Sequence, residues 1–216
     1  MVNQTEIGLL IFDMDGTIFD SDRANAEAVK RAISNMKMKI PVDEEKIGAN
    51  LGMSSEQFYK SILPRDKIQL WEELRAGTRK QHKSSIAEFG KLFPEVVETL
   101  KILRKRGYKL AICSSCSVHY FDIALSNFSI RDYFDYAECT GEHNLTKSKL
   151  VGKIKSKFPG LKAAIIGDRS QDIEAAREND ALAIGVLYGY GKDEPKEADV
   201  QIKRFSELLD IFTGSS

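Results

Sequence analysis

The sequence contains little cysteine, and its cysteines show no pattern typical of secreted proteins. Its 216 residues include three cysteines, an odd number, and the N-terminal residues lack the basic region and long apolar stretch of a secretion signal. Reduced thiols are therefore favoured over a disulfide framework, and we expect a cytoplasmic protein.

The sequence also lacks a net charge and a long apolar run. Lysine and arginine number 32, aspartate and glutamate also number 32, and the formal net charge is zero. This balance gives no field that would favour nucleic acid or an anionic membrane, and no segment reaches the uninterrupted apolar length of a membrane span. We therefore expect a small-molecule substrate, no nucleic-acid or membrane partner, and a monomer or homodimer.

The apolar residues that are present form short runs with the length of buried parallel strands. These runs cover residues 7–12, 110–113, 163–166 and 183–187, and the first three end abruptly in polar residues. Residues 94–107 have apolar side chains at helical spacing, a proline near the start and a glycine at the end. Strands that alternate with helices predict an α/β fold, a Rossmann-like doubly wound parallel sheet with helices on both faces.

Residues 20–89 interrupt this alternation. The stretches 22–38, 54–63 and 66–92 all have the pattern of helices. We predict an all-helical cap at residues 20–89, inserted into a core formed by residues 1–19 and 90–216. Because the insertion begins right after the first strand, it should lie beside the edge of the sheet where the strands end, in the place of a lid.

Four aspartates follow the predicted strands. Asp13 and Asp15 come after the first run, and Asp168 and Asp172 come after the third. The carboxyl ends of parallel strands meet at one edge of a sheet, where ligands bind. Clustered carboxylates repel one another and cannot all stay ionised without a cation. We therefore predict that these acids bind Mg²⁺, which accepts carboxylate oxygens and leaves positions for water and a substrate phosphate.

Two other polar residues fit a phosphate site. Lys147 could add positive charge, and Ser114 could donate from its hydroxyl at the end of the second run. A helix that begins after Ser114 would add backbone N–H groups suited to phosphate. Each residue alone has an ordinary explanation, such as a turn for the Asp-Gly pair or a solvated charge for the lysine, but the set together favours a site.

These residues resemble the four ordered motifs of the haloacid dehalogenase superfamily. The motifs are Asp13-Met14-Asp15-Gly16-Thr17, Ser114 after an apolar strand, Lys147, and Gly167-Asp168 with Asp172 four residues later. The helical insertion after the first motif is similar to that of the phosphoglycolate-phosphatase-like branch. The resemblance covers nearly the whole chain and implies hydrolysis of a small phosphomonoester, a small phosphorylated metabolite, with Mg²⁺ as cofactor.

The resemblance also implies a role for each motif residue. Asp13 would be the nucleophile that forms an aspartyl-phosphate, and Asp15 would be the general acid and base. Ser114 and Lys147 would hold the phosphoryl oxygens. The metal would be held by Asp13, Asp168 and the backbone carbonyl of Asp15, with support from Asp172. Ser115, Gly16 and Thr17 complete the expected phosphate-binding set.

Several alternatives remain open at this point. A β-phosphoglucomutase-like enzyme would share the aspartyl-phosphate but return the phosphoryl group to a sugar, and a regulatory phosphate-binding protein could share the fold. A thiol redox protein could use Cys113 and Cys116, which form a Cys-x-x-Cys between a strand and a helix. Lys149 competes with Lys147 for the role of site lysine.

The sequence leaves the specific substrate undetermined, but the predicted cap offers candidate contacts. Arg65, Arg75, Arg79 and Lys80 are candidates to bind a second anionic group of the substrate. We expect Trp71 to pack, with its apolar neighbours, in the cap's own core.

Overall fold

A six-stranded parallel sheet organises most of the chain. The structure is a computed structural model and describes residues 6–37, 40–51, 53, 55–141 and 145–214. The strands are β1 (Ile7–Phe12), β4 (Lys109–Ser114), β5 (Tyr136–Cys139), β6 (Lys162–Gly167), β7 (Leu182–Val186) and β8 (Val200–Ile202). Their order is β5-β4-β1-β6-β7-β8, and all neighbouring pairs are parallel. The predicted α/β class and Rossmann-like sheet are confirmed.

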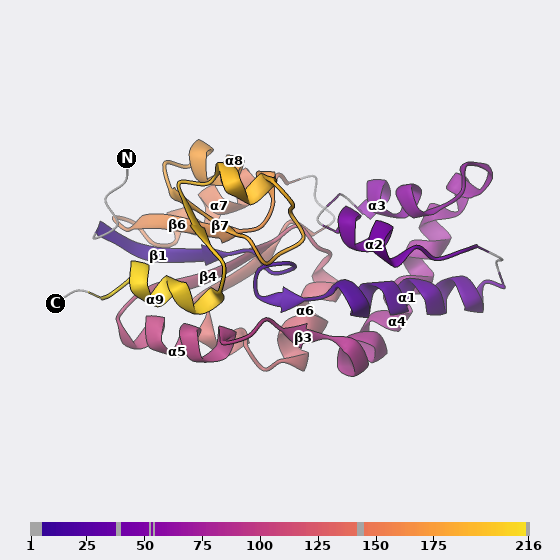
Figure 1. Cartoon of the computed structure of the whole chain (residues 1–216), viewed down its shortest axis with the longest axis horizontal. Coiled ribbons are helices and arrows are strands. Elements are labelled where there is room, and N and C mark those ends of the chain that lie inside the picture. The colour runs from indigo at the N-terminus through magenta and orange to yellow at the C-terminus, as the bar shows by residue number, and fades with distance from the viewer. Residues whose placement is uncertain (1–5, 38–39, 52, 54, 142–144, 215–216) are drawn as a thin grey trace.

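Helices cover both faces of this sheet because successive residues of a strand point to opposite faces. Leu10 and Phe12 of β1 belong to one apolar cluster, and Leu9 and Ile11 belong to another. The first cluster includes residues of α5 (Val96–Lys105), α6 (Val118–Asn127) and α9 (Leu208–Ile211), and the second includes residues of α7 (Lys147–Ser156) and α8 (Ser170–Glu178). Figure 1 shows the two layers on opposite sides of the strands. The central strand β1 is therefore buried on both faces.

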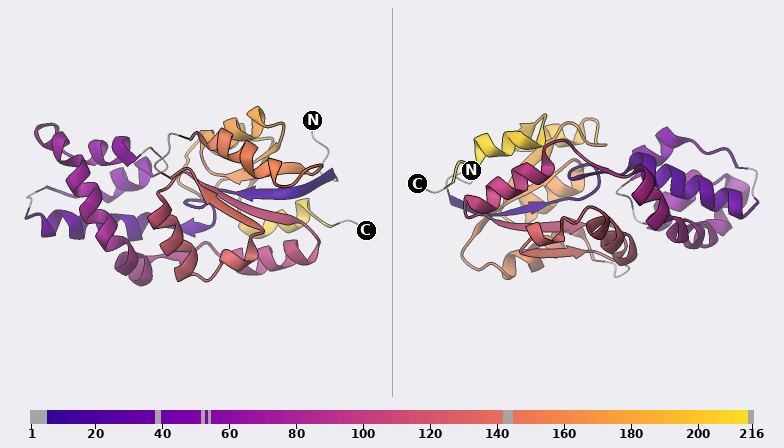
Figure 2. Two further views of the ribbon diagram at one scale, coloured as in Figure 1. Left: turned by 180° about the vertical axis from the view of Figure 1, so that it is seen from behind. Right: turned by 90° about the horizontal axis from the view of Figure 1, so that it is seen from below.

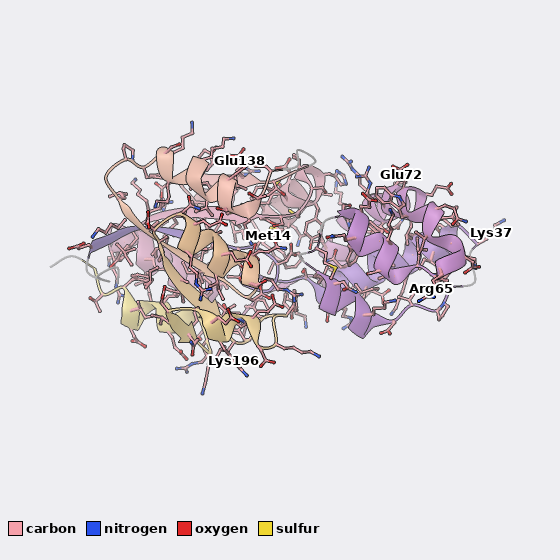
Figure 3. The ribbon with its side chains drawn as sticks, turned by 90° about the horizontal axis from the view of Figure 1, so that it is seen from above. Met14, Lys37, Arg65, Glu72, Glu138 and Lys196 are labelled. Carbon is pink, nitrogen blue, oxygen red and sulfur yellow. The ribbon has the colours of Figure 1, made fainter. Side chains whose placement is uncertain are left out.

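The remaining α-helices of the described residues form, with one 3₁₀ helix, a separate lobe at one end of the molecule. They are α1 (Asp22–Asn35), α2 (Glu44–Asn50), α3 (Ser55–Ile62), a 3₁₀ helix (Arg65–Leu70) and α4 (Trp71–Phe89), and we call them together the helical segment. In Figures 1 and 2 this segment lies beyond the carboxyl ends of the strands. Its own apolar cluster includes Val29 of α1 and Leu74 of α4. In Figure 3, Met14 lies near the junction, and Lys37 and Arg65 lie toward the outer end of the segment.

A short antiparallel ribbon connects the helical segment to the sheet. Strand β2 (Phe19–Asp20) pairs with β3 (Lys91–Leu92), and Phe19 lies opposite Leu92. The sequence-based prediction of one helix over residues 66–92 is therefore wrong at both ends. Residues 65–70 form a 3₁₀ helix, and α4 ends at Phe89 because Gly90 takes an extended conformation. The two segments that connect the sheet to the helical segment therefore lie side by side, next to the loop that carries Asp13 and Asp15.

Helix α2 is an element that the sequence pattern did not predict. Asp43 begins it, since the side chain of Asp43 accepts a hydrogen bond from the backbone N–H of Lys46 at 3.1 Å. At seven residues the helix is too short to show a clear helical period. Within the described ranges, no helix has the length and apolar composition that crossing a membrane requires.

Candidate active site

The loop after β1 is a tight turn that presents two carboxylates. The carbonyl of Met14 accepts hydrogen bonds from the N–H groups of Ile18 at 2.9 Å and Phe19 at 2.8 Å, which folds the chain back. Gly16 has a φ of +82°, and a Cβ atom at this position would lie 2.4 Å from Asp168 Oδ2. Only glycine combines this conformation with this close approach. The turn therefore brings the first aspartate loop against the loop after β6.

Lys147 lies between two buried carboxylates. It is the first residue of α7, and its Nζ is 2.6 Å from Asp13 Oδ1 and 2.5 Å from Asp172 Oδ1. Burial opposes the charged form of the lysine, but the carboxylates of Asp13 and Asp172 outweigh it and raise the pKa of Lys147. Lys149, the competing candidate, is exposed. The geometry therefore places Lys147 in contact with the first aspartate, as a site lysine would be.

The charge of Asp13 is finely balanced. Burial raises the pKa of Asp13 well above its usual range, the charge of Lys147 lowers it, and the carboxylates of Asp172 and Asp168 raise it further. Besides Lys147, the guanidinium of Arg169 lies 3.9 Å from Asp168 Oδ2. Two positive side chains do not balance three buried carboxylates, so a further cation would favour the form in which all three are ionised.

Backbone N–H groups hold one carboxylate oxygen of Asp168, and the other oxygen has no hydrogen-bond partner among the described residues. Its Oδ2 accepts hydrogen bonds from the N–H groups of Tyr190 at 2.7 Å and Gly191 at 3.1 Å. Its Oδ1 is buried and has no hydrogen-bond partner among the described residues. Burial and the neighbouring Asp172 raise the pKa of Asp168 to about 6. A buried carboxylate oxygen without a protein partner is suited to be a metal ligand.

Together these acids fit a divalent metal. Asp13, Asp168 and Asp172 each offer one carboxylate oxygen, and the three oxygens lie within 4.8 Å of one another. All three residues are buried. Oxygen ligands of this kind suit Mg²⁺. The carboxylate of Asp15 is not part of this group. The sequence-based interpretation assigns the backbone carbonyl of Asp15 to the metal, and that assignment stays a prediction.

Asp15 instead points its carboxylate toward α6. The hydroxyl of Tyr120 donates a hydrogen bond to Asp15 Oδ1 at 2.7 Å, and the side-chain amide of Asn25 donates to the same hydroxyl at 3.0 Å. Burial raises the pKa of Asp15, and hydrogen bonds from Ser21 and Tyr120 lower it. The two aspartates of the first motif therefore have different environments, one beside a lysine and other acids, the other beside a phenol. Such a division favours different chemical roles.

The predicted phosphate-binding residues are distributed around this point. Ser114 is the last residue of β4 and is buried, and its Oγ accepts a hydrogen bond from the N–H of Cys116 at 3.3 Å. Ser114 and Ser115 both line the large cavity described below. Gly16 and Thr17 do not line it in the described part of the chain, and the hydroxyl of Thr17 is buried without a hydrogen-bond partner there.

A cavity of about 510 Å³ connects the acids to the helical segment. Asp13, Asp15 and Lys147 form its inner end, and α3 and α4 contribute its outer wall. The sequence spacing of the α4 residues explains their position, since Trp71, Arg75, Arg79 and His82 lie three or four residues apart on one face of the helix. The cavity therefore joins a reactive end to a surface that can select substrates.

The structure separates the candidates that sequence reasoning grouped together in the helical segment. Arg75 and Arg79 line the cavity, whereas Arg65 and Lys80 are not among its described lining residues. Trp71 is half-buried, packs against the apolar cluster of the segment and also lines the cavity. The prediction that Trp71 packs in the core of the segment is confirmed for one part of its side chain, and the other part lines the cavity.

Sequence reasoning missed several residues of the site, of which Tyr120 and Arg169 are the most important. Arg169 follows Asp168, and its guanidinium donates to the carbonyl of Leu51 at 2.7 Å and to Glu194 Oε1 at 3.0 Å. It thus joins the loop after β6 to the helical segment. Its place next to Asp168 could have drawn attention to it, but nothing in the sequence around Tyr120 indicates a contact with Asp15.

The cysteines do not have the properties of a redox pair. Cys113 is buried in the sheet, and burial raises the pKa of its thiol well above the usual range. Burial is also the main cause of the raised pKa of Cys116. Redox-active cysteines need a lowered pKa, so these environments argue against thiol chemistry at this Cys-x-x-Cys.

Known proteins match this chain over most of its length. The family model described as haloacid dehalogenase-like hydrolase matches residues 10–186. A phosphoglycolate phosphatase of Vibrio vulnificus (strain YJ016) is 27% identical, and the alignment covers all of both chains. A phosphoglycolate phosphatase of Aquifex aeolicus (strain VF5) is 26% identical over 94% of this chain and 95% of its own length.

Solved structures share the fold. A predicted phosphoglycolate phosphatase of Haemophilus somnus 129PT superimposes with a TM-score of 0.84 at 21% identity, over 98% of this chain and 99% of its own. A haloacid dehalogenase-like hydrolase of Streptococcus pneumoniae has a TM-score of 0.82 at 24% identity, over 96% of this chain and 99% of its own. The arrangement of the sheet and the helical segment is therefore shared with these proteins.

Proposed function

Because this chain belongs to the haloacid dehalogenase-like hydrolase family and is a phosphatase, we propose that it hydrolyses phosphomonoesters through a phosphorylated Asp13 with Mg²⁺ as cofactor. The observation that carries the proposal is the meeting of Asp13, Asp168, Asp172 and Lys147 in one buried cluster, from which Asp13 and Lys147 line the cavity. The proposal assigns residues 20–89 the role of a cap over a core formed by residues 1–19 and 90–216.

In the first half of the proposed reaction, Asp13 attacks phosphorus. A carboxylate oxygen of Asp13 forms a bond to phosphorus while the bond from phosphorus to the leaving oxygen breaks. Asp15 gives its proton to that leaving oxygen, which departs as an alcohol. The raised pKa of Asp15 supports this role, since a buried carboxyl holds its proton at a pH where an exposed one does not. Tyr120 orients the carboxyl group.

In the second half, water releases the phosphate. Asp15, now a carboxylate, takes a proton from a water molecule that attacks phosphorus, and the bond between phosphorus and Asp13 breaks. Inorganic phosphate leaves, and both aspartates return to their first state. Lys147, Ser114 and Ser115 are assigned to the phosphoryl oxygens during both steps, since they line the cavity beside Asp13.

The proposed metal site consists of Asp13, Asp168 and Asp172. When bound, Mg²⁺ supplies positive charge that offsets the repulsion between the carboxylates and an incoming phosphate dianion. The unpartnered oxygen of Asp168 and the raised pKa values of Asp13 and Asp168 support this assignment.

The experiment that tests the proposal is a phosphate-release assay combined with trapping. The first substrate is 2-phosphoglycolate, after the relatives' names, and acetyl phosphate reports on the basal reaction because its leaving group departs easily. We expect Mg²⁺-dependent release, and rapid acid quenching with ³²P-labelled substrate should leave label on the wild-type chain and not on Asp13→Asn. The matched control is Asp122→Asn, the same chemical change at an exposed surface ion pair.

The outcomes separate the proposal from its alternatives. Phosphate release by Asp13→Asn at the wild-type rate would show that water attacks phosphorus directly. Labelled protein that transfers its phosphoryl group to an added sugar phosphate and releases no free phosphate would instead identify a phosphomutase.

A further inference from the structure

The outer wall of the cavity is rich in aromatic side chains. Phe58 and Tyr59 of α3 and Trp71 of α4 all line it, and the rings of Phe58 and Tyr59 form an edge-to-face pair with centroids 5.0 Å apart. Trp71 is half-buried, so part of its surface remains in contact with solvent in the cavity. Exposed aromatic surface in a concave site gains free energy when a flat apolar group covers it.

The aromatic wall is held in place before any ligand arrives. Phe58 is 9% exposed and Tyr59 is 6% exposed, and both pack in the apolar cluster of the helical segment with Leu74. Burial raises the pKa of Tyr59 to about 12, so its hydroxyl remains protonated across the physiological range. A wall whose rotamers are already fixed loses little conformational entropy on binding.

Two cations lie near the ring of Trp71. The guanidinium of Arg75 is 5.6 Å from the ring centroid, and Lys60 Nζ is 5.7 Å from it. Arg79, one turn further along α4, also lines the cavity. Cations at this distance interact with an aromatic face, and their N–H groups can be shared with the electronegative atoms of a bound ring. Lys60 also pairs with Glu56. The wall therefore matches a flat ring that carries hydrogen-bond acceptors.

The volume of the cavity also favours a leaving group with an aromatic ring. Cavities of about 300–1,000 Å³ accommodate drug-sized ligands, and this one measures about 510 Å³. Phosphoglycolate, named for the relatives, is the phosphomonoester of a two-carbon acid and would fill a small part of it. Its carboxylate could reach for an arginine, but the aromatic surface would remain covered by water.

We propose that the substrates of this enzyme are phosphomonoesters whose leaving group carries an aromatic ring, and that the ring binds against Trp71. The inference rests on the proposed phosphatase function of the same site and adds the substrate class. Phe58 and Tyr59, which are largely buried, add only the small part of their rings that lines the cavity, while Asp13 and Lys147 hold the phosphoryl end.

The test compares pairs of substrates that differ only by the ring. Benzyl phosphate is matched with ethyl phosphate, and adenosine 5′-monophosphate is matched with ribose 5-phosphate, so that the ring lies close to phosphorus in one pair and beyond a sugar in the other. We expect kcat/KM to be at least about tenfold higher for the aromatic member of at least one pair. The aromatic ring gains free energy from the apolar area that it buries and from its contact with another aromatic ring. Acetyl phosphate reports the basal phosphatase reaction in the same preparation.

A variant tests whether Trp71 causes the preference for aromatic substrates. Trp71→Ala should lower the ratio of kcat/KM within the preferred pair about tenfold, and Trp71→Phe should restore most of it. The control is Ile102→Ala on α5, which removes an exposed apolar side chain outside the cavity and should keep the wild-type ratio. Phosphonate analogues of the preferred pair give inhibition constants on wild-type enzyme, so the test does not depend on the folding of a variant.

The results distinguish the inference from the function on which it rests. Equal kcat/KM values within both pairs, with acetyl phosphate hydrolysed, would overturn the aromatic substrate class and leave the phosphatase function standing. An unchanged ratio in a folded Trp71→Ala variant would remove Trp71 from the contact. Absence of hydrolysis of 2-phosphoglycolate, acetyl phosphate and all four esters with Mg²⁺ present would overturn the proposed function itself.

Discussion

At the scale of single residues, the stability of the site depends on the small number of positive side chains beside the buried acids. Lys147 is the cation that bridges Asp13 and Asp172, and its side chain is 6% exposed. A buried ion pair contributes little net stability, but removal of one partner leaves a charge stranded in a low dielectric. The stability of the folded protein should therefore be sensitive to this single side chain.

Lys147→Ala should therefore both inactivate and destabilise the protein. We expect a loss of kcat/KM of at least about 100-fold, typical for removal of a charged group that stabilises a transition state, and a free energy of unfolding lower by about 3 kcal/mol at pH 8 without metal. Phosphate release and urea unfolding measure the two effects. Lys149→Ala is the matched control and should change stability by less than about 0.5 kcal/mol, because Lys149 is exposed. A reversed order of the two variants would identify Lys149 as the site lysine.

Tyr120→Phe tests how Asp15 is tuned. The Tyr120 hydroxyl donates to Asp15 at 2.7 Å and so stabilises the carboxylate form. Without this bond the pKa of Asp15 should rise further, and the protonated acid should persist to higher pH. We expect the basic limb of the pH profile of kcat/KM for an alkyl phosphate to move to higher pH. Tyr133→Phe, outside the cavity, should leave the profile unchanged; identical profiles for wild type and Tyr120→Phe would contradict the role.

At the scale of elements, α4 has two functions on two faces. Leu74, Thr78 and Ile86 are buried in the protein, while Trp71, Arg75 and Arg79 face the cavity. His82 lies where α4 meets α6, and its ring contacts the ring of Tyr120 at 4.9 Å between centroids. The helix thereby connects the wall of the cavity to the residue that holds Asp15.

His82 should make stability depend on pH. Burial, with His119 and Arg79 nearby, lowers its pKa from 6.5 to about 4, so the folded protein binds fewer protons than the unfolded chain between these values. Its contribution to stability is complete above pH 6.5 and is lost as pH falls toward 4. Wild type should lose up to about 3 kcal/mol more unfolding free energy than His82→Gln between pH 7 and pH 4. Urea titrations at several pH values measure this, and parallel curves would refute it.

At the scale of the whole molecule, the two lobes meet around the proposed metal site. The hydroxyl of Tyr190 accepts hydrogen bonds from the N–H groups of Ser21 at 2.6 Å and Asp22 at 3.0 Å, where the helical segment begins. The N–H of the same tyrosine donates to Asp168. Arg169 makes a second connection through the carbonyl of Leu51. A ligand that holds the buried acids in place should therefore stabilise the whole folded chain.

Mg²⁺ should accordingly stabilise the folded protein. A ligand that binds only the folded state at about 100 times its Kd adds about 2.7 kcal/mol, which corresponds to a rise in Tm of about 5–10 °C for a chain of this size. Thermal unfolding with EDTA and with Mg²⁺ measures the rise. Asp168→Asn should abolish most of it, and Asp122→Asn should keep it; an equal rise in both variants would place the metal elsewhere.

The sequence by itself determined the four central strands of the sheet and the order of its motifs, whereas the edge strands β5 and β8 were not predicted. Buried parallel strands are continuous apolar runs, and the polar residues that end them must gather at one edge, so the positions of Asp13, Ser114 and Asp168 could be predicted from local pattern and topology alone. The helical character of residues 20–89 was also visible, because amphipathic spacing is a local property.

Only the tertiary structure decided which side chains touch. The β2–β3 ribbon pairs residues more than 70 positions apart, and no local signal in two-residue strands reports such a pairing. The contact of Tyr120 with Asp15 and the two-sided environment of Trp71 depend on how α4 and α6 pack, which distant residues determine. The choice between Lys147 and Lys149 has the same origin: both belong to the first turn of α7, but only Lys147 is directed by the packing of that helix toward the buried acids.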